Sequence, residues 1–188
     1  MNEKESVRQA HVLETAYIVF TRHGFRKTSI EDIAKAAGIS RQGIYLHFKN
    51  KDEIFSASVR KALDDGLRVT DTIFDDDRST LEEKLFKALD ERFGRHVGLR
   101  FPEASDLVAQ SERILGDSVG KSSSLFQKKL EKNILASAAK KTSGAAKRAA
   151  TIASMLCACG FAWKHSLSSR QEFSEKMRDA IRLCCRDL

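Results

Sequence analysis

Apolar residues recur every three or four positions along most of the chain, which is the spacing of one face of an α-helix. No segment shows the alternation of apolar and polar residues that is typical of strands. The pattern therefore predicts an all-α protein of about nine helices. The expected helical segments are 6–23, 30–37, 41–47, 50–63, 81–97, 102–115, 125–135, 149–166 and 173–188.

Residues that favour helix ends lie between these segments. Thr28 opens a capping-box pattern ahead of the second segment, and Ser40 and Asn50 are N-cap residues ahead of the third and fourth. Gly24 and Gly38 follow the first and second segments, where a left-handed residue commonly ends a helix. These signals predict three short helices and then a longer one in the first third of the chain.

The second and third segments have the spacing of a helix-turn-helix. Two steeply crossing helices need a small residue where they touch, a residue that tolerates a left-handed turn, and an apolar residue that closes the core. Ala34, Gly38 and Ile44 stand at these positions. An ordinary helical hairpin also accommodates these three residues. The agreement with the predicted caps favours a helix-turn-helix, a motif that reads the DNA major groove.

The composition agrees with a helical chain and indicates no membrane span. The 188 residues include a single proline, Pro102, which suits the first turn of a helix. The N-terminus has acidic residues where a signal peptide carries basic ones, and the most apolar stretch, 149–163, is shorter than a membrane span. We expect a cytoplasmic protein that does not contact a membrane.

The formal net charge of +7 makes nucleic acid a natural partner, but the charge is unevenly placed. Residues 1–51 contain nine Lys and Arg against five Asp and Glu. The larger surplus lies at 121–148, with eight basic residues against one acidic residue. Such a run is usually a solvated face, although an anionic ligand or a second partner remains an alternative there.

Residues 28–51 closely resemble the DNA-binding region of the tetracycline-repressor (TetR) family, particularly at Tyr45, His47, Phe48 and 49–51. The resemblance is dense over about 6–60. It implies a sequence-specific transcriptional regulator, a repressor that a small-molecule ligand releases from a pseudo-palindromic operator. It also implies a homodimer formed through the eighth and ninth helices. The implied domains are a helix-turn-helix domain at 1–50, a connecting helix at 51–72 and a ligand-binding and dimerisation domain at 73–188.

The expected DNA contacts follow from side-chain chemistry and from this resemblance. Arg41 can donate two hydrogen bonds to guanine and Gln42 can pair with adenine, so we expect these two to specify bases. Gly43 permits close approach of the backbone. The resemblance implies backbone contacts by Tyr45 and His47, while the base preference of Leu46 stays open. The complete expected set is Thr28, Ser29, Ser40, Arg41, Gln42, Gly43, Tyr45, His47 and Lys51, with Lys51 as a phosphate anchor.

A ligand cavity is expected among the later helices, although the same apolar side chains are equally suited to filling the core. The candidate lining residues are Phe86, Leu89, Phe93, Leu107, Phe126 and Trp163. The identity of the ligand cannot be read from them.

The remaining chemistry leaves alternatives open. The cysteines are interpreted as buried thiols, with a thiol-redox-responsive regulator of the same fold as the alternative. An enzyme or a helical adaptor for protein partners is a weaker reading, because the chain lacks the common catalytic motifs. We expect no catalytic, metal or cofactor site. The cysteines concerned are Cys157, Cys159, Cys184 and Cys185.

Overall fold

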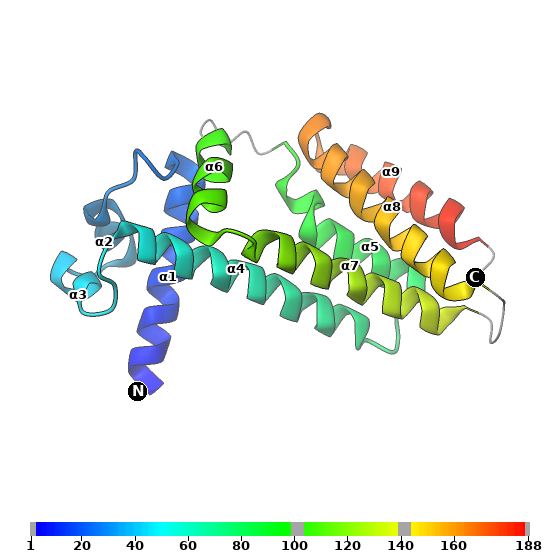
Figure 1. Cartoon of the computed structure of the whole chain (residues 1–188), viewed down its shortest axis with the longest axis horizontal. Helices are drawn as coiled ribbons and strands as arrows, with labels where there is room; N and C mark the ends of the chain where they lie inside the picture. The colour runs from blue at the N-terminus through cyan, green and yellow to red at the C-terminus, as the bar shows by residue number, and fades with distance from the viewer. Residues whose placement is uncertain (1–2, 99–103, 139–143, 187–188) are drawn as a thin grey trace. The chain divides into compact units, whose positions relative to one another are not determined.

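A computed structural model describes residues 3–98, 104–138 and 144–186, and within these ranges the chain is helical (Figure 1). This confirms the all-α prediction. No helix of the described residues is long and apolar enough to cross a membrane. The elements are α1 (Glu3–His23), α2 (Ile30–Ala37), α3 (Arg41–Tyr45), α4 (Lys51–Phe74), α5 (Leu81–Arg92), the 3₁₀ helix η1 (Gly94–His96), α6 (Ala104–Leu115), α7 (Ser118–Ser137), α8 (Ala145–Ser166) and α9 (Arg170–Cys185).

The fifth helix is shorter than its apolar stripe predicts. The stripe continues to Val97, yet α5 ends at Arg92 and the chain passes into η1. The backbone at Gly94 lies directly against the ring of Phe173, where an added Cβ would lie 2.8 Å from a ring carbon. A buried glycine at a close backbone contact therefore interrupts a pattern that periodicity alone extends.

The helices form two compact units. The N-terminal unit comprises Met1–Asp65 and Arg100–Lys121, and the C-terminal unit comprises Gly66–Leu99 and Ser122–Leu188. The division falls inside α4 and α7, and it groups α6 with the first helices. The predicted boundaries at 50 and 72 placed α6 in the ligand-binding domain instead.

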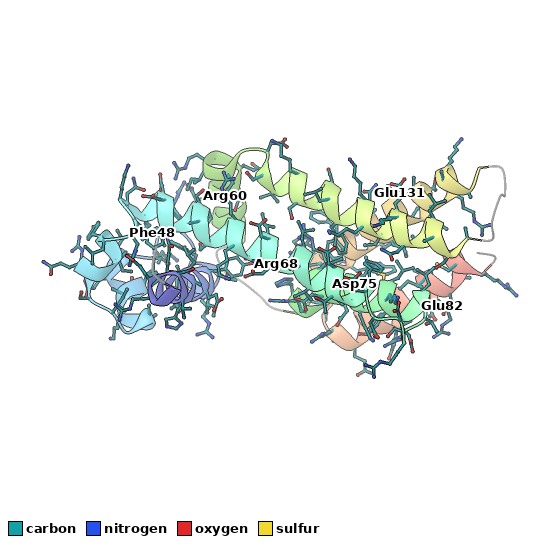
Figure 2. All side chains as sticks on the ribbon, turned by 90° about the horizontal axis from the view of Figure 1, so that it is seen from below. Phe48, Arg60, Arg68, Asp75, Glu82 and Glu131 are labelled. Carbon is teal, nitrogen blue, oxygen red and sulfur yellow. The ribbon has the colours of Figure 1, made fainter. Side chains whose placement is uncertain are left out.

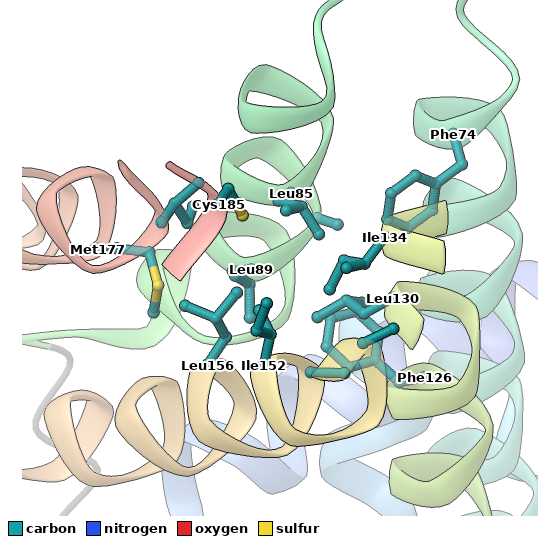
Figure 3. Packing of buried hydrophobic residues seen from close by; sticks show 14 of the residues in the cluster. Phe74, Leu85, Leu89, Phe126, Leu130, Ile134, Ile152, Leu156, Met177 and Cys185 are labelled. Atoms are coloured by element: carbon teal, nitrogen blue, oxygen red, sulfur yellow. The ribbon is translucent and has the colours of Figure 1, made fainter. Parts of the chain in front are cut away.

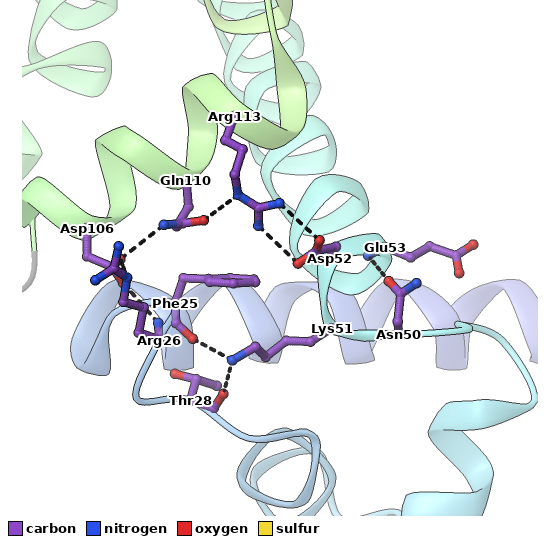
Figure 4. Close-up of polar contacts among 10 residues, drawn as sticks. All are labelled: Phe25, Arg26, Thr28, Asn50, Lys51, Asp52, Glu53, Asp106, Gln110 and Arg113. Carbon is purple, nitrogen blue, oxygen red and sulfur yellow. Dashed lines mark hydrogen bonds and ion pairs between the residues drawn. The ribbon is translucent and has the colours of Figure 1, made fainter.

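The reason for this difference is that α6 completes the core of the N-terminal unit. Leu115 of α6 is buried in the same cluster as Phe20 of α1 and Phe55 of α4. The guanidinium of Arg113 forms two hydrogen bonds with the Asp52 carboxylate, at 3.2 and 3.3 Å, and Arg26 pairs with Asp106 (Figure 4). These contacts join residues about 60 to 80 positions apart, which the local pattern of the sequence does not reveal.

An aromatic cluster lies at the centre of the N-terminal unit. The ring centroid of Phe55 is 5.1 Å from those of Phe20 and Phe25, in edge-to-face arrangements. Ile33 and Ile44 bring α2 and α3 onto the same core. Aromatic pairs in this geometry add to the stabilisation from buried area. The short helices of the unit are thus held by packing rather than by their own length.

The C-terminal unit has a separate aliphatic and aromatic core, formed mainly by α5, α7, α8 and α9 (Figure 3). Leu89, Leu156 and Met177 meet there from three different helices. Charged side chains such as Arg60 and Glu82 are exposed on the outer faces of their helices (Figure 2). Each unit therefore has its own hydrophobic core.

Candidate nucleic-acid interface

The N-terminus of α2 is capped by Ser29, and the predicted cap at Thr28 was wrong by one residue. Ser29 Oγ accepts a hydrogen bond from the Asp32 amide at 3.1 Å. The Asp32 carboxylate accepts in return from the Ser29 amide at 2.9 Å and from its hydroxyl at 2.6 Å. These bonds hold the pKa of Asp32 below its ordinary value. Ser29 itself is exposed at the first turn of α2.

Thr28 has an internal role that differs from the expected phosphate contact. Its side chain is only 2% exposed, and Oγ1 donates to the carbonyl of Gly24 at 2.7 Å. The hydroxyl therefore closes the turn that follows α1. A buried hydroxyl with a backbone partner has no geometry for a DNA phosphate, so we remove Thr28 from the expected contacts.

Lys51 also holds the same loop. Its ammonium donates to the carbonyls of Phe25 and Thr28, both at 2.9 Å, and lies 4.4 Å from the centroid of the Phe25 ring (Figure 4). The half-buried ammonium thus connects the first turn of α4 to the segment between α1 and α2. Lys51 thus fixes this loop with two of its three N–H donors, and its contact with a DNA phosphate stays a prediction.

The turn between α2 and α3 has the predicted geometry. Gly38 adopts φ 66° after the last residue of α2, and Ala34 and Ile44 are buried between the helices. Ser40 caps α3 by accepting from the Gly43 amide at 3.1 Å. The helix ends at Tyr45, two residues before the predicted end, because the bonds Phe48 N to Ile44 O and His47 N to Ile44 O close a turn there.

Arg41 and Gln42 are both exposed on the first turn of α3. The Arg41 guanidinium donates to Tyr45 Oη at 3.3 Å, and its central carbon lies 5.5 Å from the centroid of the Tyr45 ring. This hydrogen bond raises the pKa of Arg41 above its ordinary value. One turn of helix thus joins the two residues. A permanent cation and a flat amide side by side suit base edges in the major groove.

The other expected contacts surround these two residues. A Cβ added to Gly43 would lie 3.4 Å from Ser40 Oγ, an ordinary distance, so the protein itself does not require glycine there. Leu46 is 83% exposed, and the ring of half-buried His47 lies 6.3 Å from that of Phe48. The exposed members of the expected set therefore gather on α3 and on the cap of α2.

The predicted ligand residues lie in packed surroundings. Phe126 is buried and meets Phe93 edge-to-face at 6.0 Å, and Leu89 is completely buried in the same core. Trp163 packs against Phe173 at 6.4 Å, and the Arg178 guanidinium lies 3.6 Å above the ring of Phe86. These side chains fill space in the C-terminal unit in this structure.

Leu107 is the one ligand candidate whose side chain is not among the described residues. It belongs to α6, which is part of the N-terminal unit. The apolar pattern of α6 resembles that of the C-terminal helices in the sequence. Helix periodicity does not show which of the two cores a helix belongs to.

The thiols have the properties of packing residues. Burial raises the pKa of Cys157 and of Cys185 to about 11, and burial also raises the pKa of Cys184. A thiolate is the reactive form, and at neutral pH these three side chains are protonated thiols. This chemistry weighs against a redox-responsive regulator.

A surface depression in the N-terminal unit was missed by the sequence analysis. It has a volume of about 770 Å³ and is lined by Val19, Arg22, His23, Lys27, Asp32, Lys35 and Ala36. The basic residues come from two helices and a loop, so their proximity depends on tertiary contacts. The only signal in the sequence was a small surplus of positive charge over residues 1–51.

Comparison with curated proteins identifies the helix-turn-helix region. Over 69 residues the chain is 42% identical to the uncharacterised HTH-type transcriptional regulator YfiR of Bacillus subtilis, a match covering 37% of this chain and 34% of that protein. Over 54 residues it is 46% identical to the regulator AcrR of Shigella flexneri, covering 29% and 25%. The chain thus spans about a third or less of the length of these relatives.

Solved structures share the fold over nearly the whole chain. A transcriptional regulator from Rhodococcus sp. Rha1 superposes with a TM-score of 0.67 at 17% identity, covering 95% of this chain and 96% of that one. A TetR-family regulator from Pectobacterium atrosepticum gives 0.61 at 20% identity, covering 99% and 96%. FadR from Bacillus subtilis, in complex with stearoyl-CoA, gives 0.55 at 14% identity, covering 91% and 96%.

One family model matches the region that carries α2 and α3. Residues 12–58 match the model of the bacterial regulatory proteins of the tetR family. This match includes the capped helices, the turn at Gly38 and the exposed first turn of α3. Residues 12–58 are therefore similar to the DNA-binding part of the bacterial regulatory proteins of the tetR family.

Proposed function

We propose that this protein is a sequence-specific DNA-binding transcriptional regulator that acts as a repressor. The observation that carries the proposal is the exposed pair Arg41 and Gln42 on the capped first turn of α3. A recognition helix contacts base edges near its N-terminus, and Arg with guanine and Gln with adenine are the favoured pairings. Ser29, Ser40, Tyr45 and His47 contribute contacts to the sugar-phosphate backbone.

The active form in this proposal is a homodimer made through α8 and α9. The outer face of α8 carries small and apolar side chains, with Met155 52% and Phe161 62% exposed, and Leu183 on α9 is 76% exposed. A single helix-turn-helix binds DNA weakly, whereas two heads one helical turn apart read a pseudo-palindrome. The exposed residues of the α8 face are Thr151, Ser154, Met155, Ala158, Phe161 and Ala162.

A small-molecule ligand releases the repressor from its operator in this proposal. The C-terminal unit supplies its site, with Phe86, Leu89, Phe93, Phe126 and Trp163 as the candidate lining. The fold accommodates such ligands elsewhere, since FadR from Bacillus subtilis holds stearoyl-CoA. A ligand weakens DNA binding only by its differential affinity for two conformations. Because the candidate side chains are packed, the binding conformation requires some of them to move apart.

A mobility-shift assay tests the DNA-binding part. The probe is the DNA upstream of the protein's own gene, with unrelated DNA as competitor. We expect a protected, pseudo-palindromic site that survives competition. Binding that unrelated DNA removes completely would contradict sequence-specific regulation.

Light scattering after size-exclusion chromatography tests the dimer. We expect a dimer for the unmodified chain and a monomer for Phe161→Glu, since a charge in an apolar interface is costly. Lys147→Glu, an exposed change on the same helix outside the apolar stretch, is the control and leaves the dimer intact. If Phe161→Glu remains a dimer, the dimer interface lies outside this face of α8.

A further inference from the structure

The depression in the N-terminal unit gathers cationic side chains from three segments of the chain. Arg22 and His23 come from the last turn of α1, Lys27 comes from the loop that follows, and Lys35 comes from α2. All four are exposed. Val19 and Ala36 contribute apolar surface to the same lining. The site is therefore an open surface with a concentrated positive charge.

The one carboxylate in the lining offsets little of this charge. The Asp32 carboxylate already accepts two hydrogen bonds at the α2 N-terminus, from the Ser29 amide and hydroxyl, and it lies near the positive end of the helix dipole. These two bonds direct the Asp32 carboxylate toward Ser29 at the helix cap. The three permanent cations of the depression thus exceed the single anion.

The favourable interaction of basic side chains with helix dipoles explains only part of this group of charges. Arg22, His23 and Lys35 each stand in the last turn of a helix, where a positive side chain is favourable. Lys27 belongs to no helix, yet it lines the same surface. The helix dipoles therefore account for three of the four basic residues of the depression.

The surroundings indicate the ligand. The depression adjoins the capped N-terminus of α2 through Asp32, and it belongs to the same compact unit as α3. Lys and Arg side chains gathered on one exposed surface suit phosphate groups, and many protein–DNA hydrogen bonds go to the sugar-phosphate backbone. An open surface also suits a polymer of phosphates better than it suits a single small anion, which is usually held in an enclosed site.

We propose that the basic depression lined by Arg22, Lys27 and Lys35 binds the DNA sugar-phosphate backbone beside the site read by α3. The proposal rests on the proposed function. It assigns to this surface a sequence-independent share of the affinity. Arg41 and Gln42 keep the choice of base, while the depression strengthens binding to every duplex.

Salt dependence is the direct test, with the double variant Lys27→Gln and Lys35→Gln. The measurement is the affinity for an operator duplex and for a random-sequence duplex over a range of KCl concentrations. We expect the salt slope to fall by about one unit for each lost phosphate contact, and affinity near 0.1 M salt to fall about five- to tenfold per contact. Both duplexes weaken alike, so the preferred bases stay the same.

The matched control is the double variant Lys128→Gln and Lys132→Gln on α7, which removes the same net charge from another exposed surface. It leaves the slope unchanged if the depression acts by contact. Thermal unfolding of both variants checks that they are folded. Arg22→Gln is a second, independent variant with the same expected effect.

The outcomes separate the two proposals. An unchanged slope in the Lys27 and Lys35 variant, with operator binding retained, overturns the backbone site and leaves the regulator intact. So does stabilisation by inorganic phosphate without any change in DNA affinity, which assigns the depression to a free anion. Failure of the unmodified chain to bind either duplex overturns both proposals.

Discussion

The two units of this protein present their candidate functional residues in opposite ways. In the N-terminal unit, Arg41, Gln42 and Tyr45 are exposed on a short helix that buries only Ile44. In the C-terminal unit, the ligand candidates Leu89 and Phe126 are buried in the core. Exposed polar residues on a capped helix have few structural reasons to be there. A buried apolar residue always contributes to packing, so its role in ligand binding is hard to separate from its role in the core.

The largest expected effect is on the C-terminal core. Phe126→Ala should lower the free energy of unfolding by about 3–5 kcal/mol, because it removes a buried ring that meets Phe93. The preferred bases should not change. Urea unfolding and DNA binding measure the two properties. A loss below about 1 kcal/mol would indicate that Phe126 borders open space rather than packed core, and that the C-terminal candidates are not core residues.

The opposite pattern is expected for Arg41→Ala. Discrimination at one base pair should fall by about 1–3 kcal/mol, while stability changes little because the side chain is exposed. Tyr45→Phe, which keeps the ring and removes the hydroxyl partner, should lower discrimination at the same base pair by a smaller amount. Competition between duplexes that differ at single positions measures both. Effects of the two variants at different base pairs would contradict a shared contact.

A pH-dependent difference is expected in the C-terminal unit. Burial, followed by the charges of Lys164, Arg95 and Arg92, lowers the pKa of His96 from 6.5 to about 4. Between these values the unfolded chain binds the proton more readily, so the contribution of neutral His96 is complete above pH 6.5 and is lost as the pH falls toward 4.

His96→Asn removes this titration. The free energies of unfolding at pH 7 and pH 5, measured with urea, should therefore differ less in the variant than in the unmodified chain, by about 1 kcal/mol. An equal decrease in both proteins would show that His96 does not contribute to acid lability.

The smallest expected effect separates folding from DNA binding. Gly43→Ala should stabilise the N-terminal unit by up to about 1 kcal/mol, because the added Cβ meets only ordinary contacts and alanine favours helix. If the backbone of α3 approaches DNA closely, the same variant binds DNA more weakly. Thermal unfolding and mobility shift measure the opposing changes. Unaltered DNA binding would mean that no close backbone approach occurs at Gly43.

Local patterns predicted much of the N-terminal unit. The caps at Ser40 and Asn50 were identified from sequence, and Asn50 Oδ1 accepts from the Glu53 amide at 2.8 Å. The cap of α2 was placed one residue early, because Thr28 and Ser29 are both hydroxyl residues with an acidic residue three positions later. Burial of the Thr28 side chain decides between them, and burial is a tertiary property.

Long-range contacts account for what the sequence did not predict. The ammonium of Lys51 reaches carbonyls 23 and 26 residues earlier, and Arg113 reaches Asp52 across 61 residues. These contacts give Lys51 a role in fixing the loop after α1, and they place α6 in the N-terminal unit. The basic depression depends in the same way on packing between α1 and α2. Helix periodicity identifies faces, but it does not identify the partner of each face.

The central claim is that the first turn of α3 reads base sequence. The most direct test is selection from a library of randomised DNA duplexes. The selection is carried out in parallel with the unmodified chain and with the double variant Arg41→Ala and Gln42→Ala. The account predicts a pseudo-palindromic consensus for the unmodified chain, with two half-sites one helical turn apart, and loss of preference at adjacent base pairs in the variant. The same consensus from both proteins would contradict it.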